Sequence, residues 1–357
     1  FTNNIRLNGM HGIVQILHSE KGNTIQIDSP INPTAGSRLD RQAVPCFTVN
    51  APSFSRGEDL HIIRRVSVIG FLTICALFEI CVDSAAAALK AEQCGADRIE
   101  LCSSVKALGG VTPSAGSYGM MARMDHKVAH LTAVFIQPHL SLLKVYRSRG
   151  GDFLYDELEF ESMIEDVKFA KEAGAHGVVL GILTKDGEID LERNKRLISL
   201  ARPMEGKLIG IFAVNSYRAL ILICSSVTFH RAFDMAADPH VALDKLIEID
   251  ADRVLTSGQQ KTALQGAELL ADLQKAAAGR LIIMPGCGVN EKTVGDIVTK
   301  VQPKEVHLSA LKTIVGGMAY RNVKASMSTD ASSDQEYSID IADGDKIKAV
   351  IDVLEKC

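Results

Sequence analysis

The sequence contains no tryptophan, and aromatic residues make up only 5% of its 357 residues. Proteins that stack nucleic-acid bases rely on exposed aromatic side chains, so this shortage gives no support to a base-stacking surface. Positive charge is not in excess either, because the formal net charge is −4. Without a basic balance, we expect no nucleic-acid partner and no attachment to a membrane surface.

Paired cysteine motifs are also missing, since none of the eight cysteines belongs to a C-x-x-C sequence. In a long chain with 46% hydrophobic residues, we expect reduced thiols rather than a disulfide framework. This predicts a reducing, cytoplasmic environment. The apolar stretch 66–78 falls short of the roughly 20 residues that span a bilayer. It also lies too far from the N-terminus for a signal peptide, so we expect no membrane segment.

The chain changes in character at Phe78. Residues 1–77 contain turn-forming stretches such as DSPINPTAGS and show no sustained periodicity, so we expect a poorly ordered, irregular N-terminal extension there. From Phe78 onward, short apolar runs alternate with segments of helical spacing. Eight of these runs are predicted to be strands: 78–82, 98–102, 131–136, 177–183, 227–233, 253–258, 281–286 and 305–310.

The segments between these strands show the spacing of helices. Phe160, Ile164 and Val167 recur at helical intervals, and Gly95 closes an alanine-rich segment as a helix stop. Strands that alternate with helices predict a parallel sheet. The predicted fold class is therefore α/β, and eight strands favour a single (β/α)8 TIM barrel over residues 78–357 rather than an open doubly wound sheet.

Two apolar segments interrupt the alternation of strands and helices, one near 137–146 and one near 204–226. Both break the expected βα spacing. We interpret them as insertions, and we hypothesise that they are translated intron or misassigned exon sequence. A transcript that encodes both segments would reject that hypothesis.

Each of the first two predicted strands carries a glutamate and a cysteine at positions i and i+2. Glu79 and Cys81 therefore share one face of the first strand, and Glu100 and Cys102 share one face of the second. The C-terminal ends of barrel strands line the mouth of the barrel, where matching registers would bring these groups together. The alternative is structural: cysteines are often small core residues, and the glutamates could pair in an ion network with Arg98, Arg231, or Arg147 or Arg149 of the RSRGGDF loop.

Later strand ends supply further polar groups. His230, Arg231 and Asp234 crowd the end of the fifth strand, and His307 lies on the eighth. Glycine-rich turns after the sixth and seventh strands expose backbone N–H groups, which hold phosphate in this fold. The predicted anion-binding residues are Ser257, Gly258, Gly286 and Gly288, although the glycines could serve only the turns.

The segments FEICVDS, GADRIELCSS, GGVTPS, RGGDFLY, VTFHRAFDM, RVLTSGQ, IIMPGCGV, EVHLSA and EYS occur in this order. In this the chain resembles the copper homeostasis protein CutC family, over residues 78 to about 340. The resemblance implies a TIM barrel that binds Cu(I), forms homo-oligomers and occurs in the cytoplasm, with the nucleus as a further location. It also implies that Cys81 and Cys102 are the Cu(I) ligands, and soft thiolates do suit Cu(I).

Two positions depart from the family pattern. Leu108 stands where the family has a glutamate before the Gly-Gly pair, which removes a carboxylate. Cys287 occupies a position in the glycine-rich loop that is usually a small residue, so we do not expect it to be a ligand.

Three functions fit the sequence. The first is Cu(I) binding without turnover by Cys81 and Cys102. The second is an enzyme that performs acid–base chemistry on a small anionic or phosphorylated metabolite, with a catalytic set of Glu79, Glu100, His230, Arg231 and Asp234. The third is an inert barrel that acts as a scaffold. The resemblance favours the first function, whereas the residues alone support the second equally.

Overall fold

The structure is a computed structural model of the chain. It describes residues 2–5, 13–19, 22–28, 49–51, 76–117, 119, 141–173, 175–202, 211–214, 217–220, 226–322, 324–325 and 336–356. The chain divides into two compact units, Phe1–Ile74 and Cys75–Cys357. The described residues of the first unit form an antiparallel sheet, in the order β1 (Thr2–Ile5), β2 (Ile13–Ser19), β3 (Gly22–Asp28) and β4 (Val49–Ala51).

The sequence predicted irregular structure for residues 1–77; the described residues of this unit include these short strands, and the character of the whole extension stays a prediction. β2 and β3 pair from Ile13↔Asp28 to Ser19↔Gly22, so only two residues connect them, as in a tight hairpin. Both strands contain the β-branched residues that favour a pleated conformation, such as Ile16 and Ile25. β2 lacks strict alternation of apolar and polar residues, and the alternation in β3 covers only residues 24–28, which is too short to stand out among the turn-forming stretches.

The second unit is built on eight parallel strands. They are β5 (Leu77–Val82), β6 (Arg98–Leu101), β7 (Ser141–Val145), β8 (Gly177–Leu180), β11 (Ser226–Phe229), β12 (Arg253–Thr256), β13 (Ile282–Pro285) and β14 (Glu305–Leu308). Their order in the sheet is β13-β12-β11-β8-β7-β6-β5-β14, and every ladder between neighbours is parallel. The two outer strands, β13 and β14, contact each other, so the sheet closes. The predicted (β/α)8 barrel is confirmed.

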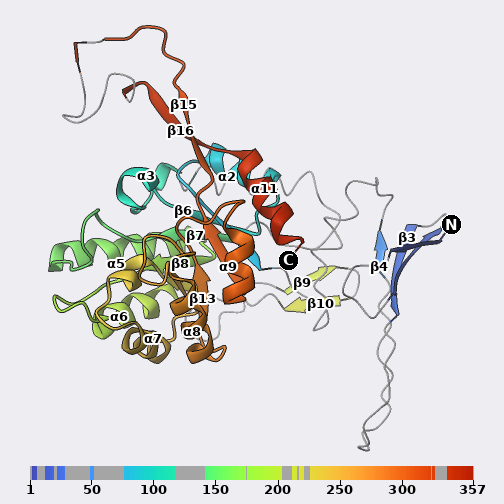
Figure 1. The fold of residues 1–357 in the computed structure, drawn as a ribbon, viewed down its shortest axis with the longest axis horizontal. Helices are drawn as coiled ribbons and strands as arrows, with labels where there is room; N and C mark the ends of the chain where they lie inside the picture. Colours follow the sequence, from blue (N-terminus) through green and yellow to red (C-terminus); the bar gives the residue numbers. More distant parts are fainter. Residues whose placement is uncertain are drawn as a thin grey trace, which may run out of the picture. The chain divides into compact units, whose positions relative to one another are not determined.

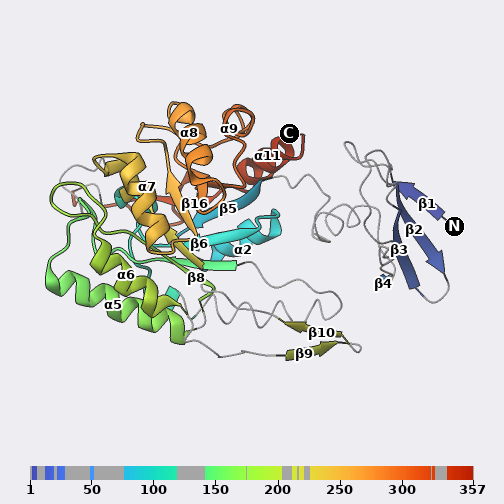
Figure 2. The same cartoon turned by 90° about the horizontal axis from the view of Figure 1, so that it is seen from below.

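Helices follow the strands and lie outside the sheet (Figures 1 and 2). They are α2 (Ala85–Gln93), α3 (Val105–Leu108), α5 (Glu157–Glu172), α6 (Leu191–Ala201), α7 (Pro239–Glu248), α8 (Ala267–Ala277), α9 (Val294–Val301) and α11 (Gly344–Leu354). Side chains cap several N-termini: Asp156 forms a capping box with Glu159 on α5, and Asp238 accepts two backbone hydrogen bonds on α7. None of the described helices is both long enough and apolar enough to cross a membrane.

One strand differs in position from its prediction. The third strand of the barrel is β7, Ser141–Val145, whereas the predicted run 131–136 lies outside the described residues. Both runs are short and apolar, so periodicity could not choose between them. β7 therefore lies within the segment near 137–146 that was interpreted as an insertion.

The segment near 204–226 contributes a hairpin to the described residues. Its strands, β9 (Ile211–Val214) and β10 (Tyr217–Leu220), pair only with each other and not with the barrel sheet. A second hairpin, β15 (Leu311–Val315) with β16 (Ser338–Ala342), follows β14 and projects from the barrel in Figure 1. The interpretation of 137–146 and 204–226 as insertions stays a prediction. Most of the apolar run 66–78 lies outside the described residues, so the expectation that it does not span a membrane also stays a prediction.

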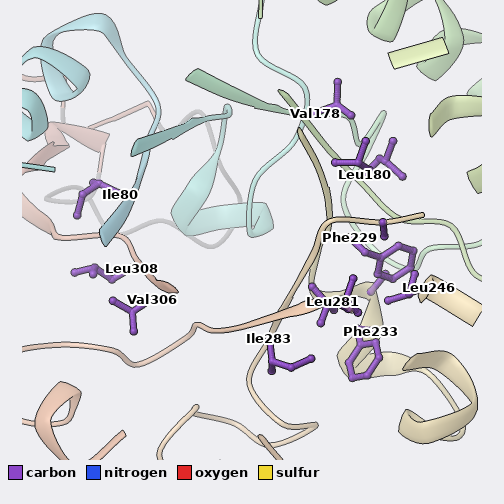
Figure 3. Packing of buried hydrophobic residues seen from close by; sticks show 14 of the residues in the cluster. Ile80, Val178, Leu180, Phe229, Phe233, Leu246, Leu281, Ile283, Val306 and Leu308 are labelled. Carbon is purple, nitrogen blue, oxygen red and sulfur yellow. The ribbon is translucent and has the colours of Figure 1, made fainter. Parts of the chain in front are cut away.

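Side chains alternate between the two faces of each barrel strand. On β5, Phe78, Ile80 and Val82 join the large apolar core against the helices, whereas Glu79 and Cys81 face the barrel interior. Figure 3 shows part of that core, including Ile80 and Leu308 from neighbouring strands and Phe229 with Leu246. The apolar residues thus bury the sheet against its helices, and the polar residues of the same strands are left to fill the barrel.

Candidate functional site

Two buried thiols meet where β5 and β6 end. Cys81 pairs in register with Glu100, so Cys102, two residues further along, lies diagonally ahead of it. The two Sγ atoms are 3.2 Å apart, and both cysteines are free. They pack against Val145 and Val179 in a small apolar cluster inside the barrel. A hydrogen bond with Cys102, burial, and the nearby Glu100 carboxylate all raise the pKa of the Cys81 thiol.

An imidazole and a carboxylate lie beside this pair. His307, on β14, places its Nε2 atom 3.8 Å from Oε2 of Glu100 on β6. Burial raises the pKa of Glu100, with the neighbouring Glu79 charge acting in the same direction. Burial opposes the protonation of His307, but the charge of Glu100 and the hydrogen bond with Glu79 outweigh it and raise the His307 pKa. We call Cys81, Glu100, Cys102 and His307 the mouth group.

Glu79 lies deeper in the barrel than Glu100, whereas the prediction placed both glutamates at the mouth. Its register partner on β6 is Arg98 rather than Glu100, because the two strands are offset. Oε2 of Glu79 is paired with Arg98, and Oε1 is 2.7 Å from His307 Nδ1. Burial alone would raise the pKa of Glu79, but Arg98 and His307 outweigh burial and lower it to about 2. The structure therefore brings two thiols and one carboxylate together at the mouth, not two of each.

Arg98 also pairs with Glu305, the first residue of β14. Glu305 in turn accepts from Arg253 Nε at 2.9 Å, and Arg253 donates to Thr228. The charged residues of this set are all nearly inaccessible to solvent. We call Glu79, Arg98, Arg253 and Glu305 the ion-paired layer. The structural ion network expected between Arg98 and Glu79 is confirmed, and Arg253 and Glu305 were missed.

The sequence carried a signal for both missed residues. Each is the first residue of its strand and lies at even spacing from an inward-facing position, as Glu305 does from His307. Arg147 and Arg149, which were also candidates to pair with the glutamates, lie elsewhere. Arg147 donates to backbone carbonyls, including that of Gly151 at 2.7 Å, and Arg149 pairs with Asp152.

His230 lies at the end of β11 and is buried. Its Nδ1 accepts a hydrogen bond from the Ala232 N–H at 3.2 Å, which indicates a proton on Nε2. Nε2 has no hydrogen-bond partner among the described residues. Burial, with a contribution from the Arg147 charge, lowers the pKa of His230 to about 3. The ring needs Gly181 on β8's end, because a Cβ there would come within 2.6 Å of it. At neutral pH this arrangement makes His230 Nε2 a hydrogen-bond donor, and its place in the catalytic set of the enzyme alternative stays a prediction.

Asp234 organises a loop. It lies in a short 3-10 turn, η1 (Arg231–Met235), and its carboxylate accepts from the backbone N–H of Ser257 at 3.0 Å and from the Thr256 hydroxyl. Arg231 Nε pairs with it at 2.8 Å. Both oxygens of Asp234 are therefore held by the protein, so this residue positions the loop after β12.

The predicted anion donors are largely paired within the protein. Ser257 N–H donates to Asp234, Gly258 N–H donates to the Thr256 hydroxyl at 2.9 Å, and Gly286 N–H donates to the Thr256 carbonyl at 3.0 Å. Gly288 lines the barrel mouth at a backbone φ of +71°. Three of the four N–H groups thus serve the turns, which is the alternative that the sequence left open.

A cavity of about 640 Å³ opens over these groups. Its lining includes Cys81, Glu100, His230, Arg231 and His307, together with residues of the loop that contains Cys287. Cys102 is fully buried and does not belong to the lining. The cavity joins the mouth group to His230 and is far larger than a single ion requires.

The fold and this site define a class: a TIM barrel that carries thiol, carboxylate and imidazole groups at the C-terminal ends of its strands. The family model described as the CutC family matches residues 76–312. The chain belongs to the CutC family.

Relatives of known name agree with this assignment. A CutC family protein of Parabacteroides distasonis is 41% identical over 275 residues, which is 77% of this chain and 99% of that protein. A human protein named copper homeostasis protein cutC homolog is 38% identical, covering 77% of this chain and 87% of the human one. Among solved structures, the CutC crystal structure from Streptococcus agalactiae has a TM-score of 0.54 at 26% identity, and covers 66% of this chain and 98% of its own.

Proposed function

We propose that this protein binds Cu(I) through the thiolates of Cys81 and Cys102, without turnover. The observation that carries the proposal is the distance of 3.2 Å between the two Sγ atoms. Two bonds of about 2.3 Å, the length of a metal–thiolate bond, can bridge sulfur atoms up to about 4.6 Å apart. One ion can therefore reach both sulfurs, and the pair must open slightly for a linear arrangement.

The surroundings of the pair suit a soft monovalent ion. Two thiolates are the donors that Cu(I) prefers, and Val145 and Val179 pack against the pair. Each thiol gives up its proton when the ion binds. Relatives named as copper homeostasis proteins support copper as the ion. The homo-oligomer and the cytoplasmic or nuclear location that the resemblance implies stay predictions.

The test is an anaerobic Cu(I) titration of the full chain against a chromophoric competitor. We expect the wild type to bind one Cu(I), and Cys81→Ser combined with Cys102→Ser to lose that binding. Cys94→Ser combined with Cys287→Ser is the matched control, since it removes two free cysteines outside the pair. Stoichiometric binding that survives in the Cys81/Cys102 variant rejects the proposal.

A second function is favoured by a separate observation. The cavity of about 640 Å³ exceeds the needs of an ion, and the buried Nε2 of His230 lines it without a partner among the described residues. These features suit an enzyme that acts on a small anionic or phosphorylated metabolite, with Glu100 as the acid–base group and Arg231 near the anion. A thermal-shift screen of phosphorylated metabolites tests it: stabilisation that His230→Gln removes supports an enzyme, and no shift at millimolar concentrations rejects it.

A further inference from the structure

Cys81 belongs to a second set of metal-ligating atoms, apart from its pairing with Cys102. Its Sγ, a carboxylate oxygen of Glu100 and a ring nitrogen of His307 all lie within 4.8 Å of one another. All three residues are buried, and they come from three consecutive strands of the barrel, β14, β5 and β6. Three different donors thus converge from a rigid sheet on one point.

His307 is oriented as an imidazole ligand. Its Nδ1 is held by Glu79 Oε1 at 2.7 Å, which leaves Nε2 directed toward Glu100. Metal-bound histidines characteristically have the second ring nitrogen held by a carboxylate in this way. Glu79 is fixed by Arg98, and Arg98 by Glu305. The ion-paired layer therefore supplies the support that keeps the ring in a ligating position.

The donor set differs in kind from the thiol pair. One thiolate, one imidazole and one carboxylate suit a borderline divalent ion such as Zn²⁺, whereas two thiolates suit Cu(I). Ligand atoms of a tetrahedral zinc centre lie about 3.3 to 3.8 Å apart, given bonds of about 2.0 to 2.3 Å. The three atoms at up to 4.8 Å need to close by only about 1 Å.

The three-residue set also differs from the thiol pair in its access to the cavity. Cys81, Glu100 and His307 all line the cavity at the barrel mouth, whereas Cys102 does not. An ion held by these three side chains would have its remaining position toward that cavity. Three protein ligands and one open position are the arrangement of catalytic zinc sites.

We propose that Cys81, Glu100 and His307 form a second metal site, for a divalent ion of the Zn²⁺ class, with its fourth position open to the mouth cavity. The site goes beyond Cu(I) binding by the cysteine pair, and the two sites share Cys81. They are therefore mutually exclusive, and each has one set of residues that the other does not use: Cys102 for Cu(I), and Glu100 with His307 for the divalent ion.

The test uses Co²⁺ as a spectroscopic substitute for Zn²⁺ in the full chain, without added thiols and without oxygen. We expect one Co²⁺ to bind with a thiolate-to-cobalt charge-transfer band and the intense visible bands of a tetrahedral centre. Zn²⁺ and one equivalent of Cu(I) should each abolish these bands. A wild type that shows no cobalt–thiolate band, or a ternary species that holds Co²⁺ and Cu(I) together on Cys81, overturns the proposal.

The variants separate the two sites. His307→Ala and Glu100→Gln should each weaken Co²⁺ binding by more than about 10-fold, the lower end of the effect of losing even an outer-shell group. Both should leave Cu(I) binding within about threefold of wild type, since neither residue is a thiol. Cys102→Ser should weaken Cu(I) binding and leave Co²⁺ binding within about threefold of wild type. His240→Ala, at an exposed histidine on α7, is the matched control.

Two further results bear on the proposal. Because His307 is buried, His307→Ala is read only if its thermal unfolding remains cooperative, and the isosteric Glu100→Gln carries the test otherwise. Co²⁺ binding that survives in Glu100→Gln, or that is lost in Cys102→Ser, overturns the second site. A failure of Cu(I) to bind the wild type would reject the proposed function and leave the cobalt result intact.

Discussion

The ion-paired layer and the mouth group are built from the same strands and differ in how their charges are satisfied. In the ion-paired layer, guanidinium groups of Arg98 and Arg253 neutralise the carboxylates of Glu79 and Glu305. In the mouth group, two thiols contact each other, Glu100 approaches His307 at 3.8 Å, and His307 is also held by Glu79 of the layer below at 2.7 Å. The charges of the ion-paired layer are neutralised by its own members, whereas the mouth group presents sulfur, oxygen and nitrogen atoms that a metal ion could bind.

This difference separates stability from function along a single strand. β6 begins with Arg98, which holds the barrel interior together, and reaches Glu100 two residues later, which faces the cavity. A buried charge costs free energy unless it is paired, so the deeper layer tolerates little change. The mouth group tolerates its incomplete pairing because the raised pKa of Cys81 keeps that thiol protonated, and burial shifts the pKa of Glu100 upward. An incoming cation can replace the thiol proton.

Removing the cation of the ion-paired layer gives the largest expected effect. Arg98→Met leaves Glu79 and Glu305 buried beside each other without their shared partner. We expect it to lower the free energy of unfolding by about 3–5 kcal/mol, as for other broken buried ion pairs. Urea denaturation at neutral pH measures the change.

Glu100→Gln is the matched control for that variant, since it lies on the same strand and is equally buried. Among the described residues no arginine forms an ion pair with Glu100, and glutamine keeps its size, so we expect a loss below about 1 kcal/mol. Equal losses in Arg98→Met and Glu100→Gln would erase the distinction between the two layers.

The pH dependence of stability tests the state of His230, which lines the mouth cavity. Burial, with help from Arg147, lowers the pKa of His230 to about 3, from about 6.5 in the unfolded chain. Between these pH values the unfolded state binds the additional proton, so the free energy of unfolding falls as pH falls. From pH 7.5 to 5, we expect His230 to contribute a loss of about 2 kcal/mol.

The measurement compares wild type with His230→Gln by urea denaturation at both pH values. The variant should lose about 2 kcal/mol less than wild type over this interval. An identical pH dependence in the two proteins would show that His230 titrates normally in the folded state, and that it is not the neutral donor inferred from its burial.

The smallest expected effect concerns a cysteine outside the pair. Cys287 adopts a φ of +77°, a conformation that costs non-glycine residues about 1 kcal/mol or more. Cys287→Gly should raise the free energy of unfolding by about 0.5–1 kcal/mol and leave Cu(I) stoichiometry unchanged. A drop in copper stoichiometry would place Cys287 among the ligands and contradict the account of the mouth group.

The sequence predicted the barrel well because its strands repeat a simple pattern. Runs such as RIEL and EVHL alternate inward polar with outward apolar residues, and glycine or capping residues mark the ends of the intervening helices. β7 was the exception, since SLLKV does not alternate polar with apolar residues and competes with the apolar run 131–136. A single sequence offers no physical reason to prefer either of two equivalent short runs.

For the site, the sequence predicted residue types better than their heights in the barrel. Cys81, Cys102 and Glu100 were placed together correctly, but Glu79 was assigned to the mouth because the offset between β5 and β6 cannot be read from alternation. Asp234 was placed in the catalytic set of the enzyme alternative, which stays a prediction, and its hydrogen bonds to Ser257 and Thr256 could not be read from the sequence. Register and loop conformation depend on contacts distant in sequence, which no local pattern encodes.

The central claim is that the two thiols of the mouth group jointly hold one copper ion, and Cu K-edge X-ray absorption of the Cu(I)-loaded chain tests it most directly. The account predicts two sulfur neighbours at about 2.2–2.3 Å from copper, close to the metal–thiolate length known for zinc, and loss of this shell in Cys102→Ser. A copper environment of nitrogen or oxygen alone, or a two-sulfur shell that persists without Cys81 and Cys102, would contradict it.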